Sequence, residues 1–179
     1  MQKMRLLAVA VLVAVFGVAP AARAEDTHKI TVETDEFSRY ITINGLIAEE
    51  KYPDVGARVW SIHSFVGKAD HSVTHRIFFY DGYQSARKGY YAAVDETAEP
   101  LKVDKIKGHN IRCGRQACAH EELVSITISD LSLREHMGTG YRVKLYPKNG
   151  EACIITLTPT MISQQLAAVA EQGGVGAGE

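Results

Sequence analysis

Apolar and polar residues alternate along most of the chain, which is typical of β-strands buried on one face. The alternation in "HKITVET" and "SRYITINGLIAEEK" predicts two strands on either side of a turn at "DEFS", and "ARVWSIHSF" and "VTHRIFFY" predict a second hairpin. In that hairpin the large apolar residues face one another in three pairs: Trp60 with Phe79, Ile62 with Ile77, and Val66 with Val73. His63 and Arg76 then lie on the opposite face.

The second half of the chain predicts more strands and two helices. "KGYYAAVD", "PLKVDKI" and "HNIRC" are weaker strand candidates, "AHEELVSITISD" is a strong one, and "YRVKLYP" with "ACIITLT" predicts a hairpin whose tip is Asn149-Gly150. Ser129 or Asp130 is expected to cap a short helix at "LSLREHM". A last helix should begin after Thr158 and pack on the sheet with an apolar stripe formed by Ile162, Leu166, Val169 and Ala170.

These elements predict a mainly β fold. We expect an antiparallel β-sandwich or partly open barrel of about eight strands, with one short helix and a C-terminal amphipathic helix. One β-rich domain should cover residues 25–172. The glycine-rich end, residues 173–179, has the composition of a disordered tail.

The N-terminal residues predict a secretory signal peptide. Lys3 and Arg5 precede an apolar run at 6–19, which is shorter than the roughly 20 residues of a membrane-spanning helix. "ARA" at 22–24 has the small residues at which signal peptidase cuts. We therefore expect cleavage after Ala24, export to the bacterial periplasm or the medium, and no membrane span in the remaining chain; an uncleaved anchor helix is the alternative.

The charge balance argues against nucleic acid as a partner. The full chain has 20 Lys and Arg and 21 Asp and Glu, and removal of 24 residues with three basic side chains would leave 17 basic and 21 acidic side chains. Such a mildly acidic surface gives no electrostatic reason to bind nucleic acid or an anionic membrane.

Two of the three cysteines lie close together in "IRCGRQACAHEELVSITISD". If Cys113 and Cys118 close a four-residue hairpin loop, they lie opposite each other and Ile111 opposes His120. The even positions of the second strand then form its apolar face: Cys118, His120, Glu122, Val124, Ile126 and Ile128. Because exported proteins meet oxidising conditions, we expect a structural disulfide between Cys113 and Cys118, which stabilises by about 2 kcal/mol through loop entropy.

The same hairpin has an alternative interpretation as a metal site. His109, Cys113, Cys118 and His120 share a face in this register, and two thiolates with two imidazoles suit zinc or copper(I). The spacing is not that of a Cys-x2-Cys knuckle, so we expect no metal or other cofactor. Thiol redox catalysis is a third interpretation, but it usually requires Cys-x-x-Cys at a helix N-terminus.

The third cysteine, Cys153, alternates with Ile155 and Leu157 in "ACIITL". This pattern predicts a buried free thiol that behaves as a small hydrophobic side chain. An intermolecular disulfide, or exchange of partners with Cys113 or Cys118, is the alternative.

The segment "FFYDGYQSARKGYYAAVD" is the richest candidate for a binding surface. Tyr and Arg are frequent at binding hot spots because they combine a large apolar area with a polar tip. The candidate contact residues are Tyr80, Tyr83, Arg87, Lys88, Tyr90 and Tyr91. The alternative is that these tyrosines only border the core.

Common catalytic patterns are missing from the sequence. It has no Gly-x-Ser-x-Gly, no His-Glu-x-x-His, no P-loop and no Rossmann glycine pattern. Adjacent acids such as Glu121 and Glu122 point to opposite faces of a strand and cannot act as a pair. We therefore expect a protein that is not an enzyme, although an active site assembled from distant residues stays open.

One resemblance concerns the region from Ile111 to Val169. It combines a Cys pair in a hairpin, a strand, "SDLSLREHMGTG", another strand, "NGE", "IITLTP" and a closing amphipathic helix. This order resembles small exported bacterial proteins of unknown function and is more distantly similar to the second half of the invasion-associated locus B family. The resemblance implies an envelope protein without catalytic residues, and we expect it to bind a protein or glycan partner.

Overall fold

The structure is a computed structural model that describes residues 29–51, 56–113 and 118–173, with only the backbone described at 109–113 and 118. The predicted signal peptide, residues 1–24, lies outside this part, as does the predicted tail apart from Gly173. Within the described residues, ten strands form two antiparallel sheets and are accompanied by two helices. This arrangement confirms the predicted mainly β, sandwich-like fold, and no closed barrel forms among these residues.

The large sheet contains the longest strands. Its order is β1 (Thr31–Thr34), β2 (Tyr40–Lys51), β3 (Ala57–Gly67), β4 (Val73–Gln84), β8 (Cys118–Ile128) and β7 (Val103–Cys113). The predicted hairpin is formed by β3 and β4, and all three apolar pairs are confirmed. His63 also pairs with Arg76 as predicted, which shows that period-two alternation determines this register.

The small sheet comes from the second half of the chain. Its order is β10 (Cys153–Leu157), β9 (Tyr141–Pro147), β5 (Tyr90–Asp95) and β6 (Pro100–Leu101). The chain leaves this sheet after β6 and enters β7 of the large sheet at Val103. The segments "PLKVDKI" and "HNIRC", predicted as separate strands, therefore form β6 followed by one long strand.

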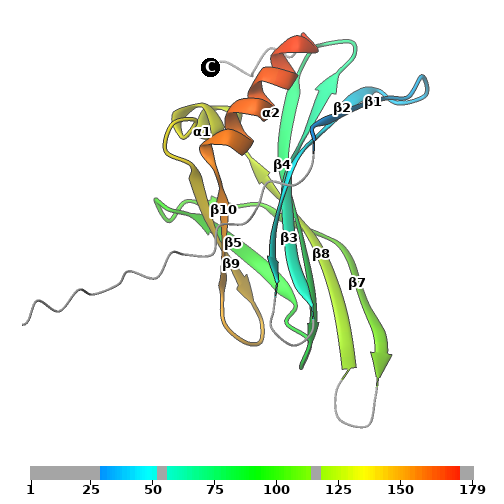
Figure 1. The fold of residues 1–179 in the computed structure, drawn as a ribbon, viewed down its shortest axis with the longest axis vertical. Helices are drawn as coiled ribbons and strands as arrows, with labels where there is room; N and C mark the ends of the chain where they lie inside the picture. The colour runs from blue at the N-terminus through cyan, green and yellow to red at the C-terminus, as the bar shows by residue number, and fades with distance from the viewer. Residues whose placement is uncertain (1–28, 52–55, 114–117, 174–179) are drawn as a thin grey trace, which may run out of the picture.

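The core lies between the two sheets and beneath the C-terminal helix. Trp60 and Phe79 of the large sheet and Leu145 and Ile155 of the small sheet are all buried in one cluster. The indole Nε1 of Trp60 also donates a hydrogen bond of 2.9 Å to the backbone oxygen of Thr156. Figure 1 shows the small sheet and the C-terminal helix on the same side of the long strands.

The two helices begin where their capping residues predict. Ser129 caps α1 (Asp130–Glu135), and Thr158 caps α2 (Pro159–Glu171) by accepting a hydrogen bond from the backbone N–H of Met161. Ile162, Leu166 and Val169 of the predicted stripe are buried. Among the described residues, no helix is long and apolar enough to cross a membrane.

The inclusion of Ala170 in the buried stripe of α2 was wrong, because Ala170 is exposed. Successive helical residues are about 100° apart, so Ala170 lies well round the helix from Val169. Met161 and Gln165 complete the buried face instead.

The register predicted for the Cys hairpin is correct at its tip and wrong further along. The backbone pairs Cys113 with Cys118, as expected, but it pairs Asn110 with His120. A bulge between Asn110 and Arg112 leaves Ile111 without a paired position on β8, so the predicted pairing of Ile111 with His120 is wrong. One extra residue in a strand shifts every pair beyond it, and alternation alone does not reveal such an insertion.

Candidate functional site

The structure does not bring the six candidate residues of the Tyr-rich segment onto one surface. Tyr83 and Tyr90 are buried, with exposed fractions of 6% and 4%. Tyr83 stacks on the ring of His120 at 5.4 Å, and Tyr90 meets Phe79 edge to face at 5.4 Å. These two tyrosines therefore belong to the core and have no exposed ring to offer a partner.

The other four candidate residues lie in three places. Tyr80 is half-buried on the outer face of the large sheet, where its hydroxyl donates to Glu121 at 2.9 Å and where burial raises its pKa to about 12. Arg87 and Tyr91 are exposed, whereas Lys88 is half-buried. Only Arg87 and Tyr91 are thus well placed to touch a partner.

The carboxylate of Glu122 holds the chain between β4 and β5. It is 1% exposed and accepts hydrogen bonds from the backbone of Gly89 at 2.9 Å, from the backbone of Tyr90 at 3.3 Å and from the hydroxyl of Tyr83. Burial opposes ionisation, but these hydrogen bonds outweigh it and lower the pKa of Glu122 below its ordinary value of 4.5. Glu122 is therefore an ionised anchor inside the protein.

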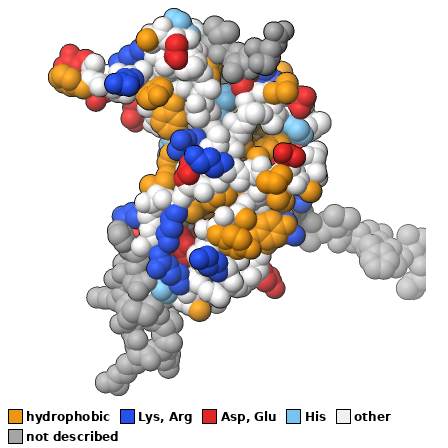
Figure 2. All heavy atoms as spheres, turned by 180° about the vertical axis from the view of Figure 1, so that it is seen from behind, with side chains coloured by type: hydrophobic (Ala, Val, Ile, Leu, Met, Phe, Trp, Pro, Cys, Tyr) orange, Lys and Arg blue, Asp and Glu red, His pale blue; other side chains and the backbone are white. Residues whose placement is uncertain are grey.

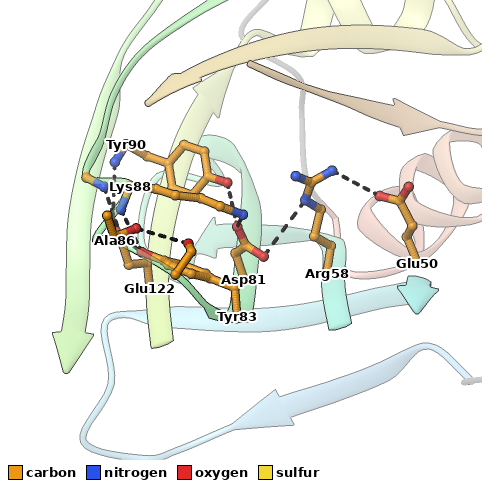
Figure 3. A network of polar contacts seen from close by, with 10 residues as sticks. Glu50, Arg58, Asp81, Tyr83, Ala86, Lys88, Tyr90 and Glu122 are labelled. Carbon is orange, nitrogen blue, oxygen red and sulfur yellow. Dashed lines mark hydrogen bonds and ion pairs between the residues drawn. The ribbon is translucent and has the colours of Figure 1, made fainter. Parts of the chain in front are cut away.

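A second buried carboxylate, Asp81, lies beside the first (Figure 3). Its Oδ2 accepts from Lys88 Nζ at 2.7 Å and from the hydroxyl of Tyr90 at 2.5 Å, and Arg58 approaches its Oδ1 at 3.8 Å. Arg58 also reaches Glu50 at 3.3 Å. Because two cations surround Asp81, its negative charge is compensated without contact with solvent.

The same segment is also bound from the small sheet. Lys148 and Asn149, in the turn between β9 and β10, donate backbone hydrogen bonds of 2.9 and 3.1 Å to the carbonyl of Lys88. The Asn149 side chain adds a bond of 2.9 Å to the carbonyl of Arg87. Hydrogen bonds from both sheets thus fix the backbone that carries Arg87 and leads to Tyr91. The buried carboxylates of Glu122 and Asp81 therefore position the exposed side chains of Arg87 and Tyr91.

The predicted disulfide and the alternative metal site depend on side chains that lie outside the described residues, namely those of His109, Cys113 and Cys118. The backbone pairs His109 with Glu121, so the bulge separates position 109 from the face on which His120 lies. His120 itself is 7% exposed and stacks on Tyr83. Among the described residues, no group of three His, Cys, Asp or Glu side chains could hold a metal ion.

Cys153 is a buried free thiol, as predicted. It lies beside the network of Asp81, Tyr90 and Arg58, and burial raises its pKa to about 11. A thiol with such a pKa is almost wholly protonated near neutrality and is a poor nucleophile.

A more promising surface is the outer face of the small sheet, which the sequence analysis did not single out. The outward positions of its three main strands are Tyr91, Ala92, Val94, Arg142, Lys144, Tyr146, Ile154 and Thr156. Tyr91 and Ile154 are 58% and 44% exposed, and Lys144 lies over the ring of Tyr146 at 5.2 Å. Seen from behind in Figure 2, hydrophobic side chains gather beside lysines and arginines. The alternation in "YRVKLYP" contains this signal, since every second residue is basic or aromatic.

A pocket of about 310 Å³ opens at the end of this face. Its lining consists of Glu96, His136, Thr139, Gly140, Arg142, Thr156, Leu157, Thr158 and Pro159. The ring of His136 forms part of the pocket wall and has a contact on each nitrogen. Its Nε2 lies 2.9 Å from Glu96, and its Nδ1 lies 2.8 Å from the carbonyl of Ser132. No local sequence pattern reveals this pocket, because its residues come from three separate segments of the chain.

A serine, a histidine and an aspartate also meet beneath α2. Ser64 Oγ lies 2.7 Å from His75 Nδ1, and His75 Nε2 lies 3.0 Å from Asp130 Oδ1. The order resembles a hydrolase triad, but Ser64 is fully buried and also accepts a hydrogen bond from Gln165. With no access for a substrate, this group connects the helices to the large sheet and has no room for nucleophilic catalysis.

Comparisons of the chain with protein-family models, curated proteins and solved structures find no match. The similarity to the invasion-associated locus B family therefore stays a prediction, and the surface and the pocket of the small sheet are the features that bear on function.

Proposed function

We propose that the protein is an exported, non-catalytic protein of the bacterial cell envelope that binds an acidic partner with the outer face of its small sheet. The observation that carries this proposal is the composition of that face. Exposed Tyr91 and Ile154 lie with the cations Arg142 and Lys144, and no outward strand position of β5, β9 or β10 holds a carboxylate.

The charge of this face differs in sign from that of the chain. The whole chain has a formal net charge of −1, so a face on which the charged strand residues are all basic favours acidic partners by charge complementarity. Aromatic residues supply apolar contact area at little cost in side-chain entropy. The hydrogen bonds that fix Arg87 and the start of β5 reduce the cost of ordering this surface on binding.

A pull-down from bacterial envelope extract tests the proposal. Tyr91→Ala and Lys144→Gln should each weaken capture of the same partner, and added salt should weaken capture by the unchanged protein. The matched controls are Tyr40→Ala, which removes a 47% exposed tyrosine of β2, and Lys107→Gln, which removes an exposed lysine of β7. Equal capture by all four variants would contradict the proposal.

Export is tested separately. The protein recovered from the periplasm should have the mass of a chain that begins at Glu25. Recovery of the intact chain from the cytosol alone would refute the envelope location.

A further inference from the structure

We infer that the pocket beside Arg142 binds the carboxylate of an acidic sugar, a uronic acid, as one unit of the partner that the small sheet holds. This inference rests on the proposed function and specifies the chemical class of its ligand. It is carried by three features of the pocket: the guanidinium of Arg142, the hydroxyl groups of the lining and the position of the pocket on the sheet.

His136 and Glu96 form one wall of the pocket. Nδ1 of His136 lies 2.8 Å from the carbonyl oxygen of Ser132, and Nε2 lies 2.9 Å from a carboxylate oxygen of Glu96. The ring of His136 therefore already engages the Glu96 carboxylate, which is the acidic group of the lining.

Arg142 gives the pocket a positive charge. It is exposed and pairs with Thr156 across β9 and β10, and its guanidinium forms no ion pair with any described residue. One uncompensated guanidinium suits one carboxylate, which it can hold with two parallel hydrogen bonds.

The rest of the lining favours a sugar over a bare carboxylate. Thr139, Thr156 and Thr158 provide hydroxyl groups, and the hydroxyl of Thr156 points from the outward face of β10. A hydroxyl both donates and accepts, as sugar hydroxyls do. A volume of about 310 Å³ is at the small end of ligand pockets and is suited to a single sugar unit.

The pocket lies on the same face of β9 as Tyr146. Arg142, Lys144 and Tyr146 occupy alternate positions of β9 and therefore one face. Four residues of an antiparallel strand span about 14 Å, so a short chain of sugars anchored at Arg142 reaches the ring of Tyr146. A glycan suits this row, because one sugar unit can occupy the pocket while the following units run along β9 to Tyr146.

The experiment is an NMR titration of the ¹⁵N-labelled full chain with glucuronate, and with glucose and acetate as matched controls. We expect saturable shifts at His136, Thr156 and Arg142 with glucuronate, and at least tenfold weaker binding of glucose and of acetate. Arg142→Gln should weaken glucuronate binding at least tenfold, whereas Lys107→Gln should not change it. Thr156→Val, which replaces the hydroxyl by a methyl group, should weaken it severalfold.

Four results would overturn the inference: no binding of glucuronate, glucuronate binding that survives Arg142→Gln, acetate that binds as tightly as glucuronate, or glucose that does so. The failure of the proposed function looks different. If capture of an envelope partner depends on Tyr91 and Lys144 but glucuronate does not bind, only the inference fails. If glucuronate binds through Arg142 but Tyr91 and Lys144 do not contribute to envelope capture, only the proposed function fails.

Discussion

Nε2 of His75 lies 3.0 Å from Oδ1 of Asp130, and this hydrogen bond joins a buried ring on β4 to the first residue of α1. The carboxylate only accepts, so Nε2 carries the proton and Nδ1 accepts from the hydroxyl of Ser64 at 2.7 Å. Gln165 of α2 completes the chain by donating to Ser64 at 2.7 Å. The neutral ring satisfies every one of these bonds, whereas a second proton on Nδ1 would require the hydroxyl of Ser64 to rotate and to accept instead of donating.

The first prediction concerns pH. Burial outweighs the attraction of Asp130 and lowers the pKa of His75 below its ordinary value of 6.5. In acid the unfolded chain therefore binds a proton that the folded chain resists, so the free energy of unfolding should fall as the pH drops below about 6.5. Urea unfolding between pH 7.5 and 5 measures this slope.

The matched variants are His75→Gln and His63→Gln. Burial also lowers the pKa of His63, so each single variant should lose part of the slope and the double variant should lose most of it. A slope that His75→Gln leaves unchanged would contradict the assignment to His75.

The second prediction compares two neighbouring acids. Glu122→Gln should lower the free energy of unfolding by about 2–4 kcal/mol, because an amide nitrogen would replace one of the two carboxylate oxygens that accept from Gly89, Tyr83 and Tyr90. Glu121→Gln should cost less than about 1 kcal/mol, because Glu121 is half-buried and accepts from the hydroxyl of Tyr80. Similar losses for both variants in chemical unfolding would disagree with the role of Glu122 as an anchor.

The sequence was informative where a single period decides the structure. The pairing of Trp60 with Phe79 follows from alternation, because a shift of one residue would expose both rings. Ser129 and Thr158 were recognisable as helix caps from their residue type and position. These features depend on neighbours in sequence or on one adjacent strand.

The candidate site was less predictable because it depends on contacts between distant segments. In the sequence, Tyr83 and Tyr90 belong to a Tyr-rich segment that is typical of a binding surface. In the structure their hydroxyl groups lie inside, because they donate to the buried carboxylates of Glu122 and Asp81. The pocket requires His136 to meet Glu96, 40 residues earlier. No local sequence pattern predicts this contact between His136 and Glu96.

The third prediction concerns the close contact between β2 and α2. A Cβ at Gly45 would lie 2.6 Å from the backbone oxygen of Ile62 and would also collide with the side-chain oxygen of Gln165. Gly45→Ala should therefore lower the free energy of unfolding by about 2–3 kcal/mol. Gly138 has no atom within 4 Å of the same position, so thermal unfolding of Gly138→Ala should show no loss of stability. Equal effects of both variants would contradict the contact.

The fourth prediction concerns the turn after β5. Ala98 has a φ of +67°, in the left-handed region where an alanine side chain is strained. Ala98→Gly should raise the free energy of unfolding by about 0.5–1 kcal/mol. The same change at the exposed Ala167 in α2 should lower it by about 1 kcal/mol, because glycine is a poor helix residue. If Ala98→Gly also destabilises the protein in urea unfolding, the strain is not present in solution.

The last prediction separates the three cysteines by their reaction with iodoacetamide, counted by mass spectrometry. The folded protein should show no alkylation, because Cys153 is buried and its pKa is raised to about 11, and because we expect Cys113 and Cys118 to be joined. Unfolding without a reductant should expose one reactive thiol, and unfolding with a reductant should expose all three. Cys153→Ser should remove the thiol that appears without reductant. If the folded, unreduced protein instead gains two labels in that variant, the hairpin holds two thiols and no disulfide, and the metal alternative at this hairpin becomes the better interpretation.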